Sequence, residues 1–223
     1  MALHLSRTFG YPLEEAANLV ELGDTVRLQG EYGLAQELLE RGWALAQEIS
    51  AYSHASHAVE ALGCLYNYLG DYGRAQRWLD QRRALESSVE FEPGVAHALL
   101  ALQQGAYRQA LDAAAHTWQW VSRSGNRSAR AKTLVVIGHA QAGLQQWTAA
   151  TDTYVQVLAL YTAVDKPIVA IEARAGLAAV ALEQGDLATA LQQVEALLPV
   201  LTDAPYWGAS TNLSAPIGTV TAS

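Results

Sequence analysis

Apolar residues recur along most of the chain at intervals of three and four, the spacing that places them on one side of an α-helix. These amphipathic stretches come in pairs, and a short turn separates the two members of each pair. The turns are centred on residues 30, 70, 105, 145 and 185, which lie 40, 35, 40 and 40 residues apart. The pattern therefore predicts a regular series of helix-turn-helix pairs.

Two columns of small residues support this register. Each turn position is followed five residues later by an alanine, and each alanine is preceded by a glycine or alanine twelve residues earlier: Gly23, Gly63, Ala98, Gly138 and Ala178. Glycine inside a helix costs roughly 0.5–1 kcal/mol relative to alanine. We therefore expect the glycines to mark close crossings of the two helices of a pair, with the alanine facing them. An aromatic residue such as Tyr32, two positions after the turn, would fill the wedge where the helices diverge.

At these positions the sequence resembles the tetratricopeptide repeat. Its first helix is similar to Leu19-x-x-Leu22-Gly23 and Val59-x-x-Leu62-Gly63-x-x-Tyr66, and its second to Ala35-x-x-x-Leu39 and Ala75-x-x-x-Leu79. The period of about 40 residues is similar to the longer-helix arrays of bacterial signalling NTPases, transcriptional regulators and kinesin-light-chain-like proteins. The resemblance implies an all-α, right-handed superhelical α-solenoid of about five helix-turn-helix repeats, whose neighbouring pairs stack around a continuous core.

The predicted solenoid spans residues 13–202, with repeats at about 13–50, 53–87, 92–123, 127–164 and 167–201. We interpret residues 1–12 as the remnant of a helix from a preceding repeat, so that the chain begins within a longer array. Ser53 is expected to cap its helix, and residues 124–126 to end another helix with a left-handed C-cap. Residues 203–223 have low charge and no helical period, which predicts a disordered tail.

Composition narrows the classes of function. With 22 acidic and 14 basic residues the formal net charge is −8, which argues against nucleic-acid binding because that function needs a basic face. A single cysteine excludes an intrachain disulfide and fits a reducing compartment, so we expect a cytoplasmic protein. No apolar run reaches the length of about 18 residues that indicates a transmembrane helix, so no membrane association is expected.

The sequence contains no catalytic motif such as a phosphate-binding glycine loop, HExxH, CxxC or GxSxG. We therefore predict a protein that is not an enzyme and holds no cofactor. One predicted helix carries a chemically varied stripe at helical spacing: His57, Glu60, Cys64, Asn67 and Tyr68. A metal held by His57 and Cys64 would need ligands from neighbouring helices, because seven residues span about 10 Å, and no second His/Cys pair offers them. An enzyme or metal site here is the least favoured hypothesis.

In the family that the sequence resembles, first helices line a concave groove, so a partner would contact their outward stripe. The candidate partner-binding residues are Asp24, Arg27, His57, Glu60, Cys64, Asn67, Tyr68, Lys132 and His139. Tyr68 and Arg27 are the expected anchors, because aromatic and arginine side chains dominate interface energetics. The Lys/Asn set that resembles a carboxylate clamp is absent, which disfavours an acidic C-terminal peptide. Trp43, Trp78 and Trp118 on second helices are expected to be packing residues.

These patterns predict a non-catalytic protein- or peptide-binding scaffold module, part of a larger cytoplasmic signalling or regulatory protein. The alternative is a ligand-sensing regulatory domain that binds a small peptide or metabolite in the groove and changes its superhelical pitch. Self-association through uncapped ends of the array is a further expectation, since the last pair is not followed by a polar capping helix.

Overall fold

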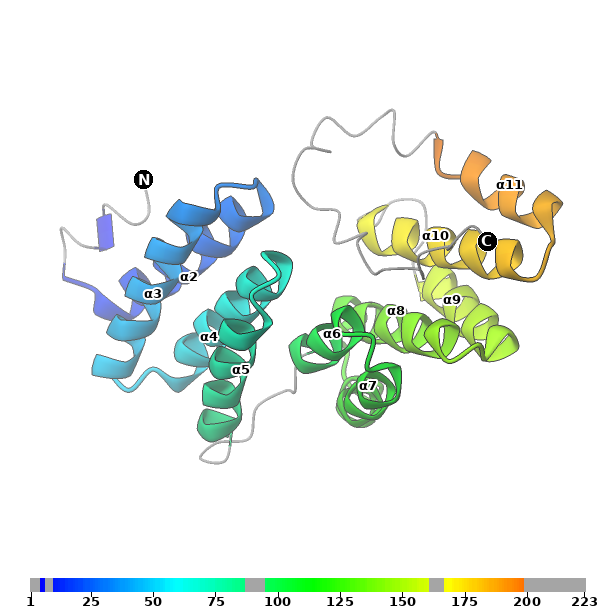
Figure 1. Ribbon diagram of the computed structural model, residues 1–223. Helices are drawn as coiled ribbons and strands as arrows, with labels where there is room; N and C mark the ends of the chain where they lie inside the picture. The colour runs from blue at the N-terminus through cyan, green and yellow to red at the C-terminus, as the bar shows by residue number, and fades with distance from the viewer. Residues whose placement is uncertain (1–4, 7–9, 87–94, 161–166, 199–223) are drawn as a thin grey trace. The chain divides into compact units, whose positions relative to one another are not determined.

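The computed structural model describes residues 5–6, 10–86, 95–160 and 167–198. These residues form an all-α protein, as predicted, with ten helices from α2 to α11 and no strand in the described ranges (Figure 1). The chain divides near residue 91 into two compact units, called unit 1 and unit 2 below. The predicted tail at residues 203–223, and most of the predicted remnant at residues 1–12, lie outside the described residues.

Unit 1 contains the first two helix pairs. These are α2 (Pro12–Leu28) with α3 (Tyr32–Glu48), and α4 (Tyr52–Tyr68) with α5 (Tyr72–Glu86). Each helix packs against the next one along the chain, and the two first helices, α2 and α4, also lie against each other. The first helices therefore share one side of the unit, as a tetratricopeptide-like stack requires.

Unit 2 contains three further pairs built on the same plan. They are α6 (Ala96–Gln103) with α7 (Tyr107–Val121), α8 (Arg127–Gly143) with α9 (Trp147–Leu160), and α10 (Pro167–Glu183) with α11 (Leu187–Glu195). The first helices are again in contact, α6 with α8 and α8 with α10, while α7 and α9 pack against the first helix that follows each of them.

The turn within each pair lies where the sequence places it. Four turns use a glycine with φ between 70° and 87°, at positions 30, 70, 105 and 185. Glycine adopts this left-handed region without a steric cost. Gln145 takes the remaining turn with φ of 59°, which costs a residue with a Cβ about 1 kcal/mol. After each turn an amide bonds back to the first helix, as Asp71 N–H does to the Tyr66 carbonyl (2.9 Å), and this satisfies a helix-end acceptor.

The glycines of the first column lie at close helix crossings, as predicted, but the residue that faces them is not the alanine. A Cβ built on Gly63 would lie 2.5 Å from Leu79 Cδ2, and Leu79 is fully buried. Two other pairs repeat this relation over the same sixteen residues, Gly23 with Leu39 and Gly138 with Tyr154. The alanine column is also buried, one helical turn earlier. The missing side chain therefore makes room for a large residue rather than for a small one.

The aromatic residue after the turn contacts the following pair, whereas the sequence suggested that it only closes its own. The Tyr32 ring of α3 lies 5.2 Å from the Tyr68 ring of α4. Tyr107 of α7 lies against α8, where a Cβ on Gly143 would be 2.4 Å from the Tyr107 ring. The reason is that a second helix packs against the next first helix as well as against its own.

Two predictions about helix ends are wrong. Helix α4 has Ala51 at its N-cap and no side-chain cap, so Ser53 lies inside the first turn. Residues 124–126 do not form a left-handed C-cap, since the φ of Gly125 is not positive. The Asn126 side chain instead accepts a hydrogen bond from the Ala129 amide (3.0 Å) and caps the start of α8. Asparagine suits either position, and here the free amides of α8 are the nearer partners.

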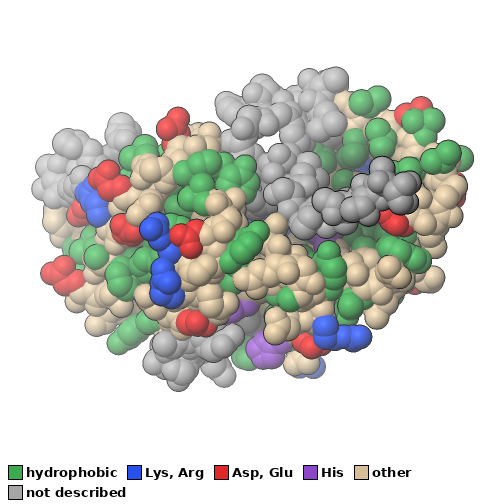
Figure 2. Space-filling model, in the orientation of Figure 1, with side chains coloured by type: hydrophobic (Ala, Val, Ile, Leu, Met, Phe, Trp, Pro, Cys, Tyr) green, Lys and Arg blue, Asp and Glu red, His purple; other side chains and the backbone are tan. Residues whose placement is uncertain are grey.

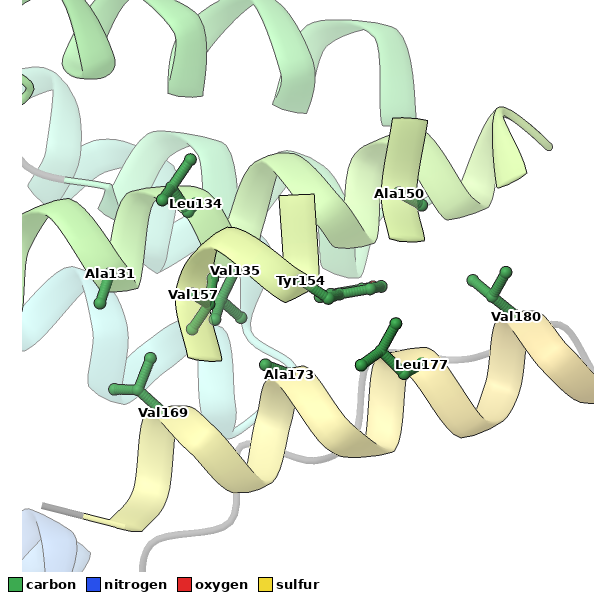
Figure 3. Packing of buried hydrophobic residues seen from close by; sticks show 10 residues of the cluster. All are labelled: Ala131, Leu134, Val135, Ala150, Tyr154, Val157, Val169, Ala173, Leu177 and Val180. Atoms are coloured by element: carbon green, nitrogen blue, oxygen red, sulfur yellow. The ribbon is translucent and has the colours of Figure 1, made fainter. Parts of the chain in front are cut away.

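In unit 2, helices α8, α9 and α10 share one buried layer of side chains, in which Tyr154 lies among aliphatic neighbours such as Leu177 (Figure 3). Trp118 packs against the same layer. In unit 1, Trp43 and Trp78 meet edge to face with their rings 5.0 Å apart, which joins the second helices α3 and α5. The contacts of these three tryptophans agree with a packing role.

Candidate functional site

Seven of the nine candidate partner-binding residues lie in unit 1 and two lie in unit 2. All nine lie on first helices: α2 and α4 in unit 1, and α8 in unit 2. The structure therefore groups them as two clusters, one within each unit, and their surroundings differ.

Arg27 and Asp24 form an ion pair on the last turns of α2. Arg27 Nη2 lies 2.8 Å from Asp24 Oδ1, and Arg27 Nε donates a hydrogen bond to the same oxygen at 2.9 Å. The Arg27 side chain is only 13% exposed, whereas that of Asp24 is 45% exposed. Because the guanidinium is enclosed and already paired, it can present donors and a flat surface but has little net charge to offer an acidic ligand.

Tyr68 is the other expected anchor. Tyr32 of α3 contacts Tyr68 and lies near Arg27, so it links the two anchors. The two tyrosine rings are tilted by 44°. A hydrogen bond with the Tyr68 side chain, together with partial burial, raises the pKa of Tyr32 to about 12, while the nearby Arg27 acts in the opposite direction. Tyr68 is 42% exposed. We call Asp24, Arg27, Tyr32 and Tyr68 the Tyr68 cluster; it joins three helices and leaves one aromatic ring at the surface.

The remaining candidates on α4 differ in their availability. Cys64 and Asn67 are half-buried next to Tyr68, and Asn67 Oδ1 is buried without a hydrogen-bond partner among the described residues. His57 is exposed. Glu60 instead faces α5, where its carboxylate lies 3.5 Å from Arg82 Nη2.

Arg82 is an important residue that sequence reasoning missed. Its side chain is only 4% exposed, and Nε donates to Ser56 Oγ at 3.2 Å in addition to the ion pair with Glu60. Losing one partner of a buried ion pair is strongly destabilising, so Glu60 holds the α4–α5 pair together as well as lining its edge. The repeat register carried a signal, because the other pairs have Gly42, Thr117, Val157 and Leu197 at this position.

His139, a candidate in unit 2, makes a hydrogen bond inside the protein rather than pointing to a partner. Its Nδ1 lies 2.8 Å from the Tyr154 hydroxyl, and burial lowers the pKa of His139 to about 4, so the ring is neutral at pH 7. Tyr154 is itself held between two first helices, since a Cβ on Gly138 of α8 or on Gly176 of α10 would lie 2.6 Å or 2.3 Å from its ring. His139 therefore supports the core and presents little to a partner.

Glu172 of α10 is a second residue that sequence reasoning missed. It is half-buried, and burial raises the pKa of its carboxyl to about 7, while the exposed Lys132 of α8 acts to lower it. Glu172 lies forty residues after Lys132 and so occupies the same place in the repeat register, which was the available signal. Lys132, His139, Tyr154 and Glu172 form what we call the Glu172 cluster.

Other kinds of site receive no support from the described part of the chain. No group of three or more His, Cys, Asp or Glu side chains there is placed to hold a metal ion. None of the helices in the described ranges combines the length and the apolar character needed to cross a bilayer. On the face seen in Figure 2, the Lys and Arg side chains are few and stand close to acidic ones.

Comparison with solved structures identifies the architecture. The crystal structure of BtubC (BKLC) from P. vanneervenii matches with a TM-score of 0.71 and 15% identity, over 90% of this chain and 87% of that one. A putative kinesin light chain from Podosopora anserina, with nearly identical TPR-like repeats, matches with a TM-score of 0.61 and 18% identity, over 87% of this chain and 99% of that one. This chain has the tetratricopeptide-like repeat fold.

No family model and no curated protein sequence matches the chain. The likeness therefore rests on architecture, and the specific role has to be argued from the two clusters.

Proposed function

We propose that the chain is a non-catalytic protein- or peptide-binding module, and that its main contact surface is the Tyr68 cluster with the adjacent Cys64 and Asn67. The observation that carries this proposal is the position of Tyr68. Its ring is 42% exposed on a first helix, and contact with Tyr32 of α3 holds it in place. A fixed aromatic ring at the surface loses little conformational freedom on binding, which is why such residues serve as anchors.

The chemistry of the cluster indicates what it would bind. Arg27 is already neutralised by Asp24, so an acidic anchor would gain little there. The Tyr68 ring offers an apolar and aromatic contact at the surface, whereas Asn67 Oδ1 is buried. An extended peptide that places an apolar or aromatic side chain over the Tyr68 ring would fit this surface.

A selection from a random peptide display library tests this proposal. Selected peptides should bind Tyr68→Ala at least about tenfold more weakly than the parent, because truncating an interface anchor typically costs 2 kcal/mol or more. Tyr52→Ala is the matched control, since Tyr52 is a tyrosine of the same helix with similar exposure (47%) at its other end. Its affinity should stay within about twofold of the parent value.

The melting temperatures of both variants should remain near that of the parent. Selected peptides that bind Tyr68→Ala as tightly as the parent would refute the assignment of this surface. Loss of binding in both variants with their folds intact would refute it equally. The membership of the module in a larger cytoplasmic signalling protein stays a prediction from the sequence.

A small-ligand-sensing role is the second candidate, and the Glu172 cluster favours it. Two groups with shifted pKa values, His139 and Glu172, lie there on neighbouring first helices, and shifted pKa values are typical of functional sites. A thermal-shift screen with short peptides and metabolites tests it. Stabilisation that is lost in Lys132→Met and Glu172→Gln would support a ligand at this cluster, whereas stabilisation unchanged by both would exclude it.

A further inference from the structure

Helix α11, the last one in the described part of unit 2, carries an apolar stripe that faces solvent. Leu187 is 69% exposed, Leu191 is 59% exposed and Val194 is 46% exposed. Their spacing of four and three residues places them on one face of the helix, which we call the α11 face. Helix α11 packs against α10, its partner in the pair, on another side.

The repeat register shows what this face contacts elsewhere in the same chain. Val194 lies forty residues after Tyr154 and so corresponds to Leu39, Leu79 and Tyr154, all of which are fully buried. Tyr154 touches the next first helix directly, at Gly176. Leu187 corresponds to Tyr32 and Tyr107, which also contact the next first helix. Leu187 and Val194 of the α11 face therefore lie at register positions through which α3, α7 and α9 contact the first helix that follows each of them.

Two of these first helices, α10 and α4, share a pattern of residue sizes, whereas α8 has Thr133, Val136, Ile137 and Ala140 in the same register. On α10 the buried residues facing α9 are small at the first two positions and apolar at the next two: Ala173, Gly176, Leu177 and Val180. On α4 the same register holds Ala58, Ala61, Leu62 and Leu65, all buried. A helix that fits the α11 face should thus have small residues at positions i and i+3 and larger apolar residues at i+4 and i+7.

The opposite end of the chain does not offer this pattern. In α2 the same register holds Asn18, Glu21, Leu22 and Thr25, and Glu21 and Thr25 are exposed. Docking α2 of a second copy onto the α11 face would bury polar and charged groups without partners, which is costly. Head-to-tail self-association therefore does not explain the α11 face.

The charge around the stripe also disfavours a second copy. Asp186 and Glu195 flank the stripe on α11, Glu183 ends the preceding helix, and α11 contains no basic residue. Two α11 faces packed together would bring these acidic edges against each other, whereas a helix with basic flanks would be attracted.

We propose that the α11 face binds an amphipathic helix of another protein, with the small and apolar spacing of α10 and with Lys or Arg along its edges. This is a second interaction surface with a helical ligand, on different residues from the Tyr68 cluster. It does not depend on the function proposed for that cluster.

A peptide from the chain itself provides the probe. The segment 167–183, with Glu172→Lys and Glu183→Lys, has the required face and basic edges. Its fluorescently labelled form should bind the full chain saturably in an anisotropy titration, and more weakly as salt is raised. The matched control peptide carries Leu177→Glu in addition, which places a charge in the apolar face and should abolish binding.

Protein variants locate the contact. Leu191→Glu and Leu187→Glu should each lower the affinity for the peptide by at least about tenfold. Gln192 is an exposed neighbour, and Gln192→Glu, which adds the same charge, should change the affinity by less than about twofold. All three residues are exposed, so the melting temperatures should remain near that of the parent.

Five results would overturn the proposal. They are the absence of saturable binding, equal binding of the Leu177→Glu peptide, and equal weakening by Gln192→Glu, any of which removes the specific face. The fourth is a parent dimer in sedimentation that Leu191→Glu dissociates, which would make a second copy the occupant. Peptide binding that appears only after removal of residues 199–223 would also overturn it, because the chain's own C-terminal segment would then cover the face.

Discussion

Replacing Gly176 with alanine tests how tightly Tyr154 is held between two helix pairs. The added Cβ would lie 2.3 Å from Tyr154 Cζ and 2.6 Å from Cε1, well inside contact distance. The ring cannot move away freely, because Gly138 lies close to it as well and its hydroxyl bonds to His139 at 2.8 Å. Either the ring or helix α10 must therefore shift.

The magnitude follows from two opposing effects. Overpacking a well-filled core typically costs about 1–3 kcal/mol, while alanine in a helix gains up to about 1 kcal/mol over glycine. We expect Gly176→Ala to lower the free energy of unfolding by about 1–2 kcal/mol, measured by urea denaturation followed by circular dichroism. Gly33→Ala in α3 is the control, because a Cβ there meets nothing within 4 Å. It should stabilise by up to about 1 kcal/mol.

A double-mutant cycle separates the clash from other effects. In a Tyr154→Leu background the side chain is smaller, so adding Gly176→Ala should no longer destabilise and should recover the gain in helix propensity. The account fails if Gly176→Ala is as stable as the parent, or if its cost is the same in both backgrounds.

Three further predictions follow from the same structure. Gln145→Gly should raise the free energy of unfolding by up to about 1 kcal/mol, because glycine adopts the positive φ without strain, and Gly185→Gln should lower it by a similar amount. Effects of the same sign for the two changes in urea melts would contradict this. Tyr154→Phe should cost about 1 kcal/mol, because the buried His139 nitrogen loses its partner, and an unchanged urea midpoint would show that the bond contributes nothing. The third concerns pH. The raised pKa of Glu172, about 7 instead of 4.5, means that the folded state holds an extra proton and loses stability as pH rises from 4.5 to 7. The lowered pKa of His139, about 4 instead of 6.5, has the opposite sign, so stability rises with pH between 4 and 6.5. The parent should therefore show a nearly flat dependence from pH 4.5 to 6.5, while Glu172→Gln should become more stable across that window, by an amount on the order of 1.4 kcal/mol per unit of pKa difference. Identical pH profiles for the two proteins would be the contrary result.

The helix pairs and their turns could be predicted because the same helix-turn-helix pattern occurs five times in the sequence. The residue that packs against each crossing glycine also lies at a constant spacing from it. A large residue stands sixteen positions after Gly23, Gly63 and Gly138, and a smaller one, Ala114, stands sixteen positions after Ala98. The alanine column is the more regular of the two, so periodicity alone favours it as the partner of the glycines. Only the packing shows that a missing Cβ receives a bulky side chain.

The candidate site was predicted in part, for a similar reason. Which residues face outward follows from one helix alone, so the exposed Tyr68 could be found, whereas the Arg27 side chain is enclosed beside Asp24 and only 13% exposed. The link between them through Tyr32 depends on how a second helix packs against the next pair, and periodicity does not contain that information. Arg82 and Glu172 were missed because each is a polar residue at a half-buried or buried position, and their contacts come from neighbouring helices.

Binding of a peptide across the first helices at the Tyr68 cluster can be measured directly through Cys64. This residue is the single cysteine of the sequence, half-buried one helical turn before Tyr68. The rate at which a thiol reagent labels Cys64 should fall several-fold when a selected peptide saturates the parent, and should be unaffected by the same peptide in Tyr68→Ala. An unchanged labelling rate at saturating peptide would place the binding surface elsewhere and contradict the account.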